Sequence, residues 1–129
     1  MAVNKTSLSA GEIIRKMLLA DQEVAKRTKK VFPVVTDSAE LPYILYRRAQ
    51  LDHNPVKGRM GADTVAMEII CYAKGYTESV ELAEAVREVL DGQQGEIPGL
   101  VMRGSYLADS EESWSDDAYE QRLVFNIKL

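Results

Sequence analysis

The chain has 129 residues and a formal net charge of −4, with 46% hydrophobic and 28% charged residues. This composition predicts one folded domain over residues 1–129 and excludes a disordered chain or a solenoid of repeats. The acidic balance argues against a nucleic-acid binder that neutralises backbone phosphates. No apolar run approaches the roughly 20 residues that span a bilayer, and MAVNKTSLSAGE lacks the hydrophobic segment of a signal peptide, so no membrane is expected.

The first predicted helix begins at about Ala10. Ser9-Ala10-Gly11-Glu12 has the pattern of a capping box, and apolar residues follow at helical spacing. Asp21 can restart or continue the helix toward Ala25. The basic cluster KRTKK, residues 26–30, suits the end of a helix dipole and is interpreted as a solvated helix end; contact with nucleic acid or an acidic neighbour is the alternative.

Two strand-like segments follow. Val31 to Val35 is a short apolar run that Pro33 interrupts, which is typical of a sheet edge. Leu41 to Leu51 predicts a strand with an arginine on each face. The polar stretch from Asp52 to Gly61 contains proline and glycine and is predicted to be a loop.

The clearest secondary-structure pattern lies in residues 63–92, DTVAMEIICYAKGYTESVELAEAVREVLDG, where the hydrophobic period changes from 2 to 3.6. This change predicts a half-buried strand followed by an amphipathic helix. Thr77 is placed to cap that helix, and Gly92 to end it in a left-handed conformation. Cys71, the only cysteine, falls on the apolar side of the strand and is predicted to be a core residue.

The C-terminal part predicts two more strands. Residues 93–99 are a turn-rich connection, and Leu100 to Leu107 has the texture of a strand. Asp109 to Asp117 is predicted to be a second polar loop. From Tyr119 to Leu129, apolar and polar residues alternate with one exception, Gln121, which predicts an amphipathic strand.

These elements predict an α+β fold in which an antiparallel sheet of about four main strands carries two helices packed on one face. The other face of the sheet is left partly open. We expect it to carry more apolar surface than a monomer usually exposes, so that oligomerisation buries it. The residues expected on this open face are Tyr46, Ile70, Tyr72, Val101 and Val124.

No catalytic, cofactor or metal site is predicted. His53 lies in a predicted loop without nearby ligand partners, and the acidic segment DSEESWSDD, residues 109–117, lacks the glycine-centred pattern of a calcium loop. The motifs of phosphate-binding loops, zinc proteases and nucleophile elbows do not occur, and a serine, histidine and aspartate triad has no local support. We therefore expect a protein that is not an enzyme and binds no cofactor.

Three segments carry a resemblance to a known family: the strand LPYILYRRA, the strand end IICYAKGY and the helix ESVELAEAVREVLDG. Together they resemble the phage tail terminator, or tail completion, proteins of long-tailed phages and prophages. The segments come in the family's order, after an N-terminal helix and before two C-terminal strands. The resemblance therefore covers nearly the whole chain.

The resemblance implies a structural protein that forms a ring, usually of six copies. Such a ring caps the tail tube, ends tube polymerisation and offers a surface to the head connector. The partners implied are further copies of the chain, the tail tube protein and a head completion or connector protein, with no membrane and with nucleic acid only as DNA in passage. The implied location is the host cytoplasm during assembly and then the virion tail.

A second interpretation is a small-molecule-binding or regulatory α+β domain whose open sheet face holds a ligand. A ring has a mass near six subunits, whereas a ligand-binding domain is a monomer or dimer with a bounded pocket. For the ring, we expect the interface to combine the open face with two oppositely charged loops that meet across the subunit boundary. The predicted interface residues are Tyr46, Ile70, Tyr72, Arg47, Lys57, Arg59, Asp109, Glu111, Glu112, Asp116 and Asp117.

Overall fold

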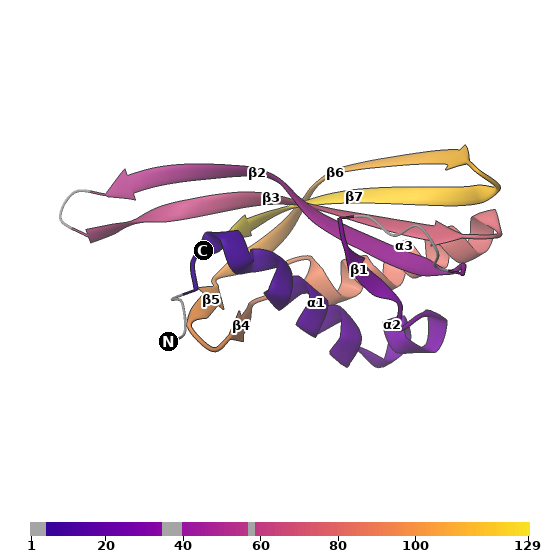
Figure 1. Ribbon diagram of the computed structural model, residues 1–129, viewed down its shortest axis with the longest axis horizontal. Coiled ribbons are helices and arrows are strands. Elements are labelled where there is room, and N and C mark those ends of the chain that lie inside the picture. Colours follow the sequence, from indigo (N-terminus) through magenta and orange to yellow (C-terminus); the bar gives the residue numbers. More distant parts are fainter. Residues whose placement is uncertain (1–4, 35–39, 57–58) are drawn as a thin grey trace.

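The computed structural model describes residues 5–34, 40–56 and 59–129, without the side chains of 54–56 and 59–61. A five-stranded sheet with the order β1-β2-β3-β7-β6 forms one layer, and the helices form a second layer under one of its faces (Figure 1). All neighbouring strands of this sheet are antiparallel except β1 and β2. The strands are β1 (Val31–Pro33), β2 (Tyr43–Val56), β3 (Arg59–Ala73), β6 (Gly104–Ser115) and β7 (Ala118–Lys128). The predicted α+β class is confirmed, with five strands in place of about four.

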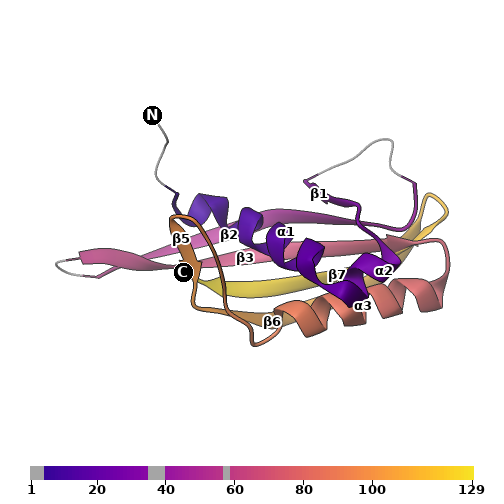
Figure 2. The same cartoon turned by 90° about the horizontal axis from the view of Figure 1, so that it is seen from below.

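Three α-helices occur in the described part of the chain, one more than predicted: α1 (Ala10–Ala20), α2 (Gln22–Arg27) and α3 (Tyr76–Leu90). A 3-10 turn, η1 (Ser7–Ser9), leads into α1. Asp21 separates α1 from α2, because its side chain accepts a hydrogen bond from the Val24 amide at 3.0 Å and caps the second helix. Figure 2 shows α1 and α3 crossing the sheet face side by side.

Two predicted caps are wrong. Ser9 makes no capping hydrogen bond with its side chain; Thr6 caps the preceding turn instead. At α3, Gly75 occupies the N-cap position, so Thr77 already lies inside the helix. The predicted left-handed residue after α3 is confirmed, because Gly92 has a φ of 72°.

The core lies between the sheet and the helices. The predicted apolar side of β3 is confirmed, since Val65, Met67, Ile69 and Cys71 are all buried. Phe125 on β7 and Ile13 on α1 are fully buried in the same cluster. Burial also raises the pKa of the Cys71 thiol, so this cysteine is a neutral core residue as predicted.

A second, two-stranded sheet of β4 (Gly95–Ile97) and β5 (Leu100–Met102) packs against α1. Val101 belongs to this small sheet and not to the open face of the large one, so its predicted placement is wrong. In the described residues no helix is long and apolar enough to cross a bilayer.

Most of the two predicted polar loops lies in strands, and residues 57 and 58 are outside the described part. β2 continues to Val56 and β3 begins at Arg59, while β6 continues to Ser115. Backbone hydrogen bonding holds these segments in ladders although most of their residues are polar. Asp116 and Asp117 form the whole connection between β6 and β7, with φ angles of 50° and 63°, as a type I′ turn requires.

The β2–β3 and β6–β7 hairpins end on opposite sides of the molecule along its longest axis (Figure 1). The pairing of β3 with β7 stops at Thr64 and Lys128. The Leu129 amide still donates to the Asp63 carbonyl at 3.0 Å; beyond that point no third strand pairs with β2 and β3 in the described residues, and the hairpin continues as a two-stranded arm.

Candidate assembly surfaces

The face of the large sheet opposite the helices is the first candidate surface, called here the open face. The rings of Tyr43 and Tyr72 stack on it with centroids 4.7 Å apart. Leu45 lies opposite Ile70 in the β2–β3 register, and Val124 is partly exposed on β7. The predicted positions of Ile70, Tyr72 and Val124 on this face are confirmed by their register.

Tyr46 lies on the helix side of the sheet, so its predicted place on the open face is wrong. It pairs in register with Ile69, which is fully buried in the core. The Tyr46 ring packs so closely on α1 that a Cβ added at Gly11 would lie 3.0 Å from its Cε2 atom. Burial raises the pKa of the Tyr46 hydroxyl, which is consistent with this position.

Four charged residues cross the open face in a line of alternating sign, one from each of four neighbouring strands. We call them the charge row: Arg47 on β2, Glu68 on β3, Arg122 on β7 and Glu111 on β6. The Arg47 guanidinium lies 3.1 Å from Glu68, Arg122 Nε lies 2.9 Å from the same carboxylate, and Arg122 Nη1 lies 3.3 Å from Glu111. The row thus begins at one side of the sheet with a cation and ends at the other with an anion.

Glu68 is the centre of the charge row, and its side chain is only 6% exposed. Burial by itself raises the pKa of this carboxyl, but hydrogen bonds from Arg122 and Arg47 outweigh burial and leave the pKa below its usual range. Glu68 is therefore an ionised group that two arginines hold in place. Nearby, burial and the charge of Glu120 raise the pKa of Tyr72 to about 12.

The predicted acidic residues of the β6–β7 hairpin divide between the two faces of the sheet. Asp109 and Glu111 lie on the open face, opposite Val124 and Arg122. Glu112 lies on the helix side, opposite Gln121. Asp116 and Asp117 occupy the turn and are exposed.

An aromatic cluster surrounds Glu112 on the helix side of the hairpin. The Tyr76 hydroxyl donates to Glu112 at 3.0 Å, and the Gln121 amide donates to the same carboxylate at 3.1 Å. The Tyr76 and Tyr119 rings meet edge to face at 5.7 Å. Trp114, opposite Tyr119 in register, is 57% exposed. The first turn of α3 thus supports the hairpin from below.

At the base of the β2–β3 arm, three polar residues join the arm to the N-terminal turn. The Ser7 hydroxyl donates to one oxygen of Asp63, and His53 Nδ1 contacts the other. These two contacts, first that of Ser7, lower the pKa of the Asp63 carboxyl. Because serine and histidine bind the same carboxylate, the serine hydroxyl is not activated by the histidine as in a catalytic triad.

The remaining residues of the predicted basic loop are only partly described. Arg47 belongs to the charge row, and Arg48 donates to the Leu8 carbonyl at 3.0 Å. Arg59 is the first residue of β3, but its side chain lies outside the described part. Lys57 lies outside the described residues altogether.

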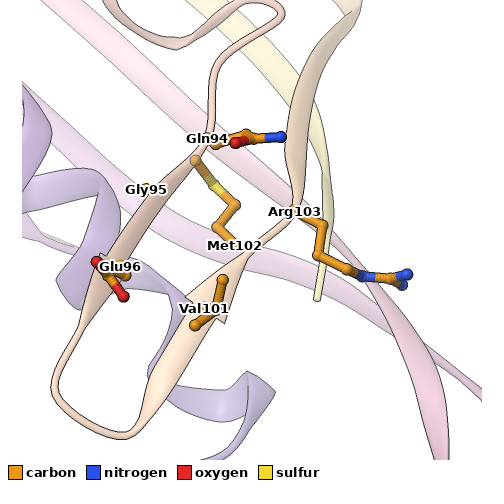
Figure 3. Close-up of a pocket in the computed structure, with 6 residues that line it drawn as sticks. All are labelled: Gln94, Gly95, Glu96, Val101, Met102 and Arg103. Carbon is orange, nitrogen blue, oxygen red and sulfur yellow. The ribbon is translucent and has the colours of Figure 1, made fainter.

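The cavities of the described region do not favour a ligand on the open face. One, of about 380 Å³, lies at the β4–β5 hairpin, where Figure 3 shows Gln94, Glu96 and Arg103 spread apart with no common point of convergence. A groove of about 850 Å³ runs along α1 beside Tyr46. Both lie on the helix side of the sheet. Within the described residues, no cluster of three His, Cys, Asp or Glu side chains is placed to hold a metal ion.

Sequence reasoning missed Tyr43, Leu45 and the pairing of Glu68 with both arginines. The alternation of β3 and β7 already places Glu68 and Arg122 on the polar sides of these strands. This pattern could have indicated that both residues lie on the open face. Their contact depends on a register that pairs Ile70 with Arg122 and Glu68 with Val124. That register is set by the long-range packing of the sheet and not by either strand alone.

Comparisons with known proteins give a family and a fold. The family described as "Tail completion protein gp17" matches residues 12–128. Among solved structures, a chain from "Virion of native gene transfer agent (GTA) particle" is similar with a TM-score of 0.82, over 95% of this chain and 98% of that one. The sequence identity is 17%, so this similarity shows the fold. No curated protein matches the chain.

Proposed function

This chain belongs to the tail completion protein gp17 family, and from that premise we propose that it forms a ring that caps the tail tube of a phage or prophage. The ring ends tube polymerisation and provides the surface that joins the head. The observation that carries the proposal is the family match over residues 12–128, which leaves few residues of the chain unaccounted for.

The two sides of the sheet support a head-to-tail ring. In such a ring every subunit presents two different surfaces to its neighbours. β2 and β6 lie on opposite sides of β3 and β7, and the charge row ends with Arg47 on the first and Glu111 on the second. A subunit with opposite charges on its two sides is suited to contact further copies of itself in one direction.

The open face supports assembly through its apolar side chains. Tyr43, Leu45, Ile70 and Tyr72 form one continuous group at the end of the sheet where the β6–β7 hairpin also ends. In a ring, the neighbouring copy brings its own β6–β7 hairpin to this end. We propose that this contact covers the partly exposed side chains of Tyr43, Ile70 and Tyr72, whereas Leu45 is already buried within the chain.

The two-stranded arm gives further support. A hairpin without a third strand is marginally stable in water, because few of its side chains are buried. The arm formed by β2 and β3 beyond Thr64 lacks such a strand in the described region. Contact with another copy or with the tail tube stabilises such an arm.

The partners in this proposal are copies of the chain, the tail tube protein and a head completion or connector protein. The location is the host cytoplasm during assembly and the virion tail afterwards. Nucleic acid is a partner only through transient contact with DNA that passes the ring. The net charge of −4 disfavours a protein that binds DNA by neutralising its phosphates.

A polymerisation assay tests the capping function directly. Purified tube protein from the same tail is allowed to polymerise with and without the purified chain, and tube lengths are measured by electron microscopy. We expect the chain to stop elongation and to be visible at one tube end. Tubes that grow to the same length with the chain present would contradict the proposal. The same chain unfolded by heat is the control.

A further inference from the structure

We propose that neighbouring copies meet edge to edge through the charge row, with Glu111 of one copy against Arg47 of the next. The inference rests on the proposed ring and names the contact between its subunits. The occupant of each sheet edge is therefore a second copy of this chain.

The first observation is the unfinished pairing at both ends of the row. Glu68 in the interior has two arginines and is 6% exposed. Arg47 and Glu111 are 48% and 64% exposed, and each has one charged partner in the described residues. A guanidinium carries five donors and a carboxylate about four acceptor positions, so both ends have capacity for a further ion pair.

The second observation is that, in the described part of the chain, both ends lie where no further strand pairs with the sheet. β1 covers β2 only as far as Tyr46, where the Val34 amide donates to the Tyr46 carbonyl at 2.7 Å. Arg47 is the next residue. On the other side, β6 is the last strand of the sheet order. In the described residues no further strand pairs with β2 at Arg47 or with the outer side of β6 at Glu111, so strands of another chain can pair there.

The third observation is the sign of the two charges. Charged side chains on an edge strand often serve only to prevent unwanted pairing, and either sign serves that purpose. Here the two edges differ in sign. Pairing of like edges would place glutamate against glutamate or arginine against arginine, whereas pairing of unlike edges continues the alternation of the row. The pattern thus disfavours a two-fold dimer and favours a head-to-tail contact.

The arrangement of the hairpins makes this contact distinct from a meeting of hairpin tips. The β2–β3 and β6–β7 tips lie at opposite ends of the molecule (Figure 1), so copies that lie edge to edge in the same direction keep them apart. Edge contact therefore predicts that Arg47 and Glu111 matter for assembly while the turn residues Asp116 and Asp117 do not.

A mixing experiment tests the contact. One chain carries Arg47→Glu and a second carries Glu111→Arg, and the mass of each particle is measured by native mass spectrometry. Alone, each variant places like charges in every contact and is expected to remain monomeric. Mixed in equal amounts, the variants can alternate so that every contact joins opposite charges, and rings with equal numbers of both are expected. The variant Asp116→Asn with Asp117→Asn is the matched control, because it removes both charges and asparagine tolerates the positive φ of the turn; it should assemble as the wild type does.

Four results overturn the inference. If the wild type and both single variants all form the ring, the edge contact is wrong. It is also wrong if the wild type forms a ring but the mixture of the two variants stays monomeric. Neither result contradicts the ring itself. A turn variant that fails to assemble although folded shows that the hairpin tips meet instead. A monomeric wild type contradicts the ring itself and the edge contact with it. Circular dichroism establishes that the variants are folded.

A milder pair of variants keeps the inference testable if Arg47→Glu does not fold beside Glu68. Arg47→Gln and Glu111→Gln each remove one charge without adding repulsion. Each is expected to weaken the contact by about 1.5- to 5-fold, as the loss of a cross-strand ion pair does. If the two side chains pair only with each other, the double variant should have the same affinity as the weaker of the two single variants. Independent, multiplying effects would show that the two side chains do not meet.

Discussion

The two long hairpins of this protein have the same backbone architecture and different support. The β6–β7 hairpin closes with a two-residue turn, and α3 supports it through the contact of Tyr76 with Glu112. The β2–β3 arm continues past the last pairing with β7 and is tied at its base by Asp63 to Ser7. One hairpin is thus part of the packed domain, and the other projects from it (Figure 1).

This difference teaches which part of the molecule can adapt on assembly. Regions with few buried contacts open at lower free energy than the core does. In the proposed ring, we expect the β6–β7 hairpin to offer a fixed surface to a neighbour and the arm to adapt when it meets one. The open face of the sheet lies between the β6–β7 hairpin and the arm.

The largest expected effect follows from charges on the open face. Ile70 lies opposite Arg122 and Tyr72 opposite Glu120, so Ile70→Glu with Tyr72→Lys gives each new charge an opposite partner within the chain. We expect this double variant to keep its helical content and to lose the ring, because the neighbour's apolar contact is gone. Size-exclusion chromatography with light scattering measures the mass. Val101→Glu, at an exposed position of the small sheet, should change nothing. A double variant of unchanged mass would exclude the open face from the interface.

Cys71→Ser tests whether both hairpins depend on one core. Cys71 is fully buried on β3, the strand that pairs with both β2 and β7. A serine hydroxyl there has little to bind, so we expect a loss of about 1 to 3 kcal/mol in the free energy of unfolding. Urea unfolding should remain a single transition. Rapid labelling of the native wild-type thiol would instead mean that β3 faces the other way.

Glu112→Ala acts on the β6–β7 hairpin alone. It removes the acceptor that holds Tyr76 and Gln121, which we expect to cost about 1 kcal/mol. Amide hydrogen exchange should become faster in residues 110–115 and stay unchanged at the base of the arm. Glu78→Ala, an exposed glutamate in the first turn of α3, is the control. Faster exchange in the arm as well would show that the two hairpins are not independent.

The smallest expected effect is the response of the arm to acid. The folded protein lowers the pKa of Asp63, so the carboxylate contributes stability above its unfolded pKa of about 4, and this contribution is lost as pH falls through the lower folded value. Glu68 behaves in the same direction. Amide exchange at the base of the arm, corrected for the intrinsic effect of pH, should therefore rise below about pH 4. Asp63→Asn should remove this dependence at the arm and leave that of the charge row; an unchanged profile would contradict the role of Asp63.

Sequence alone predicted the parts of this fold in which local pattern and packing agree. The strand and helix of residues 63–92, the restart at Asp21 and the left-handed Gly92 all follow from spacing and caps. The outer ends of the two hairpins were predicted as loops because most of their residues are polar. Alternation shows a strand only where one face is buried, and residues 109–115 on β6 are exposed throughout.

The errors at the interface have a similar cause. β2 carries apolar residues and an arginine on each face, so its sequence does not show that Ile44 and Tyr46 face the helices while Leu45 does not. The charge row depends on register across four strands, which only the assembled sheet determines.

Native mass spectrometry of the purified wild-type chain tests the central claim most directly. A head-to-tail ring of the kind proposed predicts a dominant particle of six 14.4 kDa subunits, with no accumulation of dimers as dilution breaks it down. The measurement is made at concentrations well above those of the assembly experiments. A monomer or a closed dimer under these conditions would contradict the account.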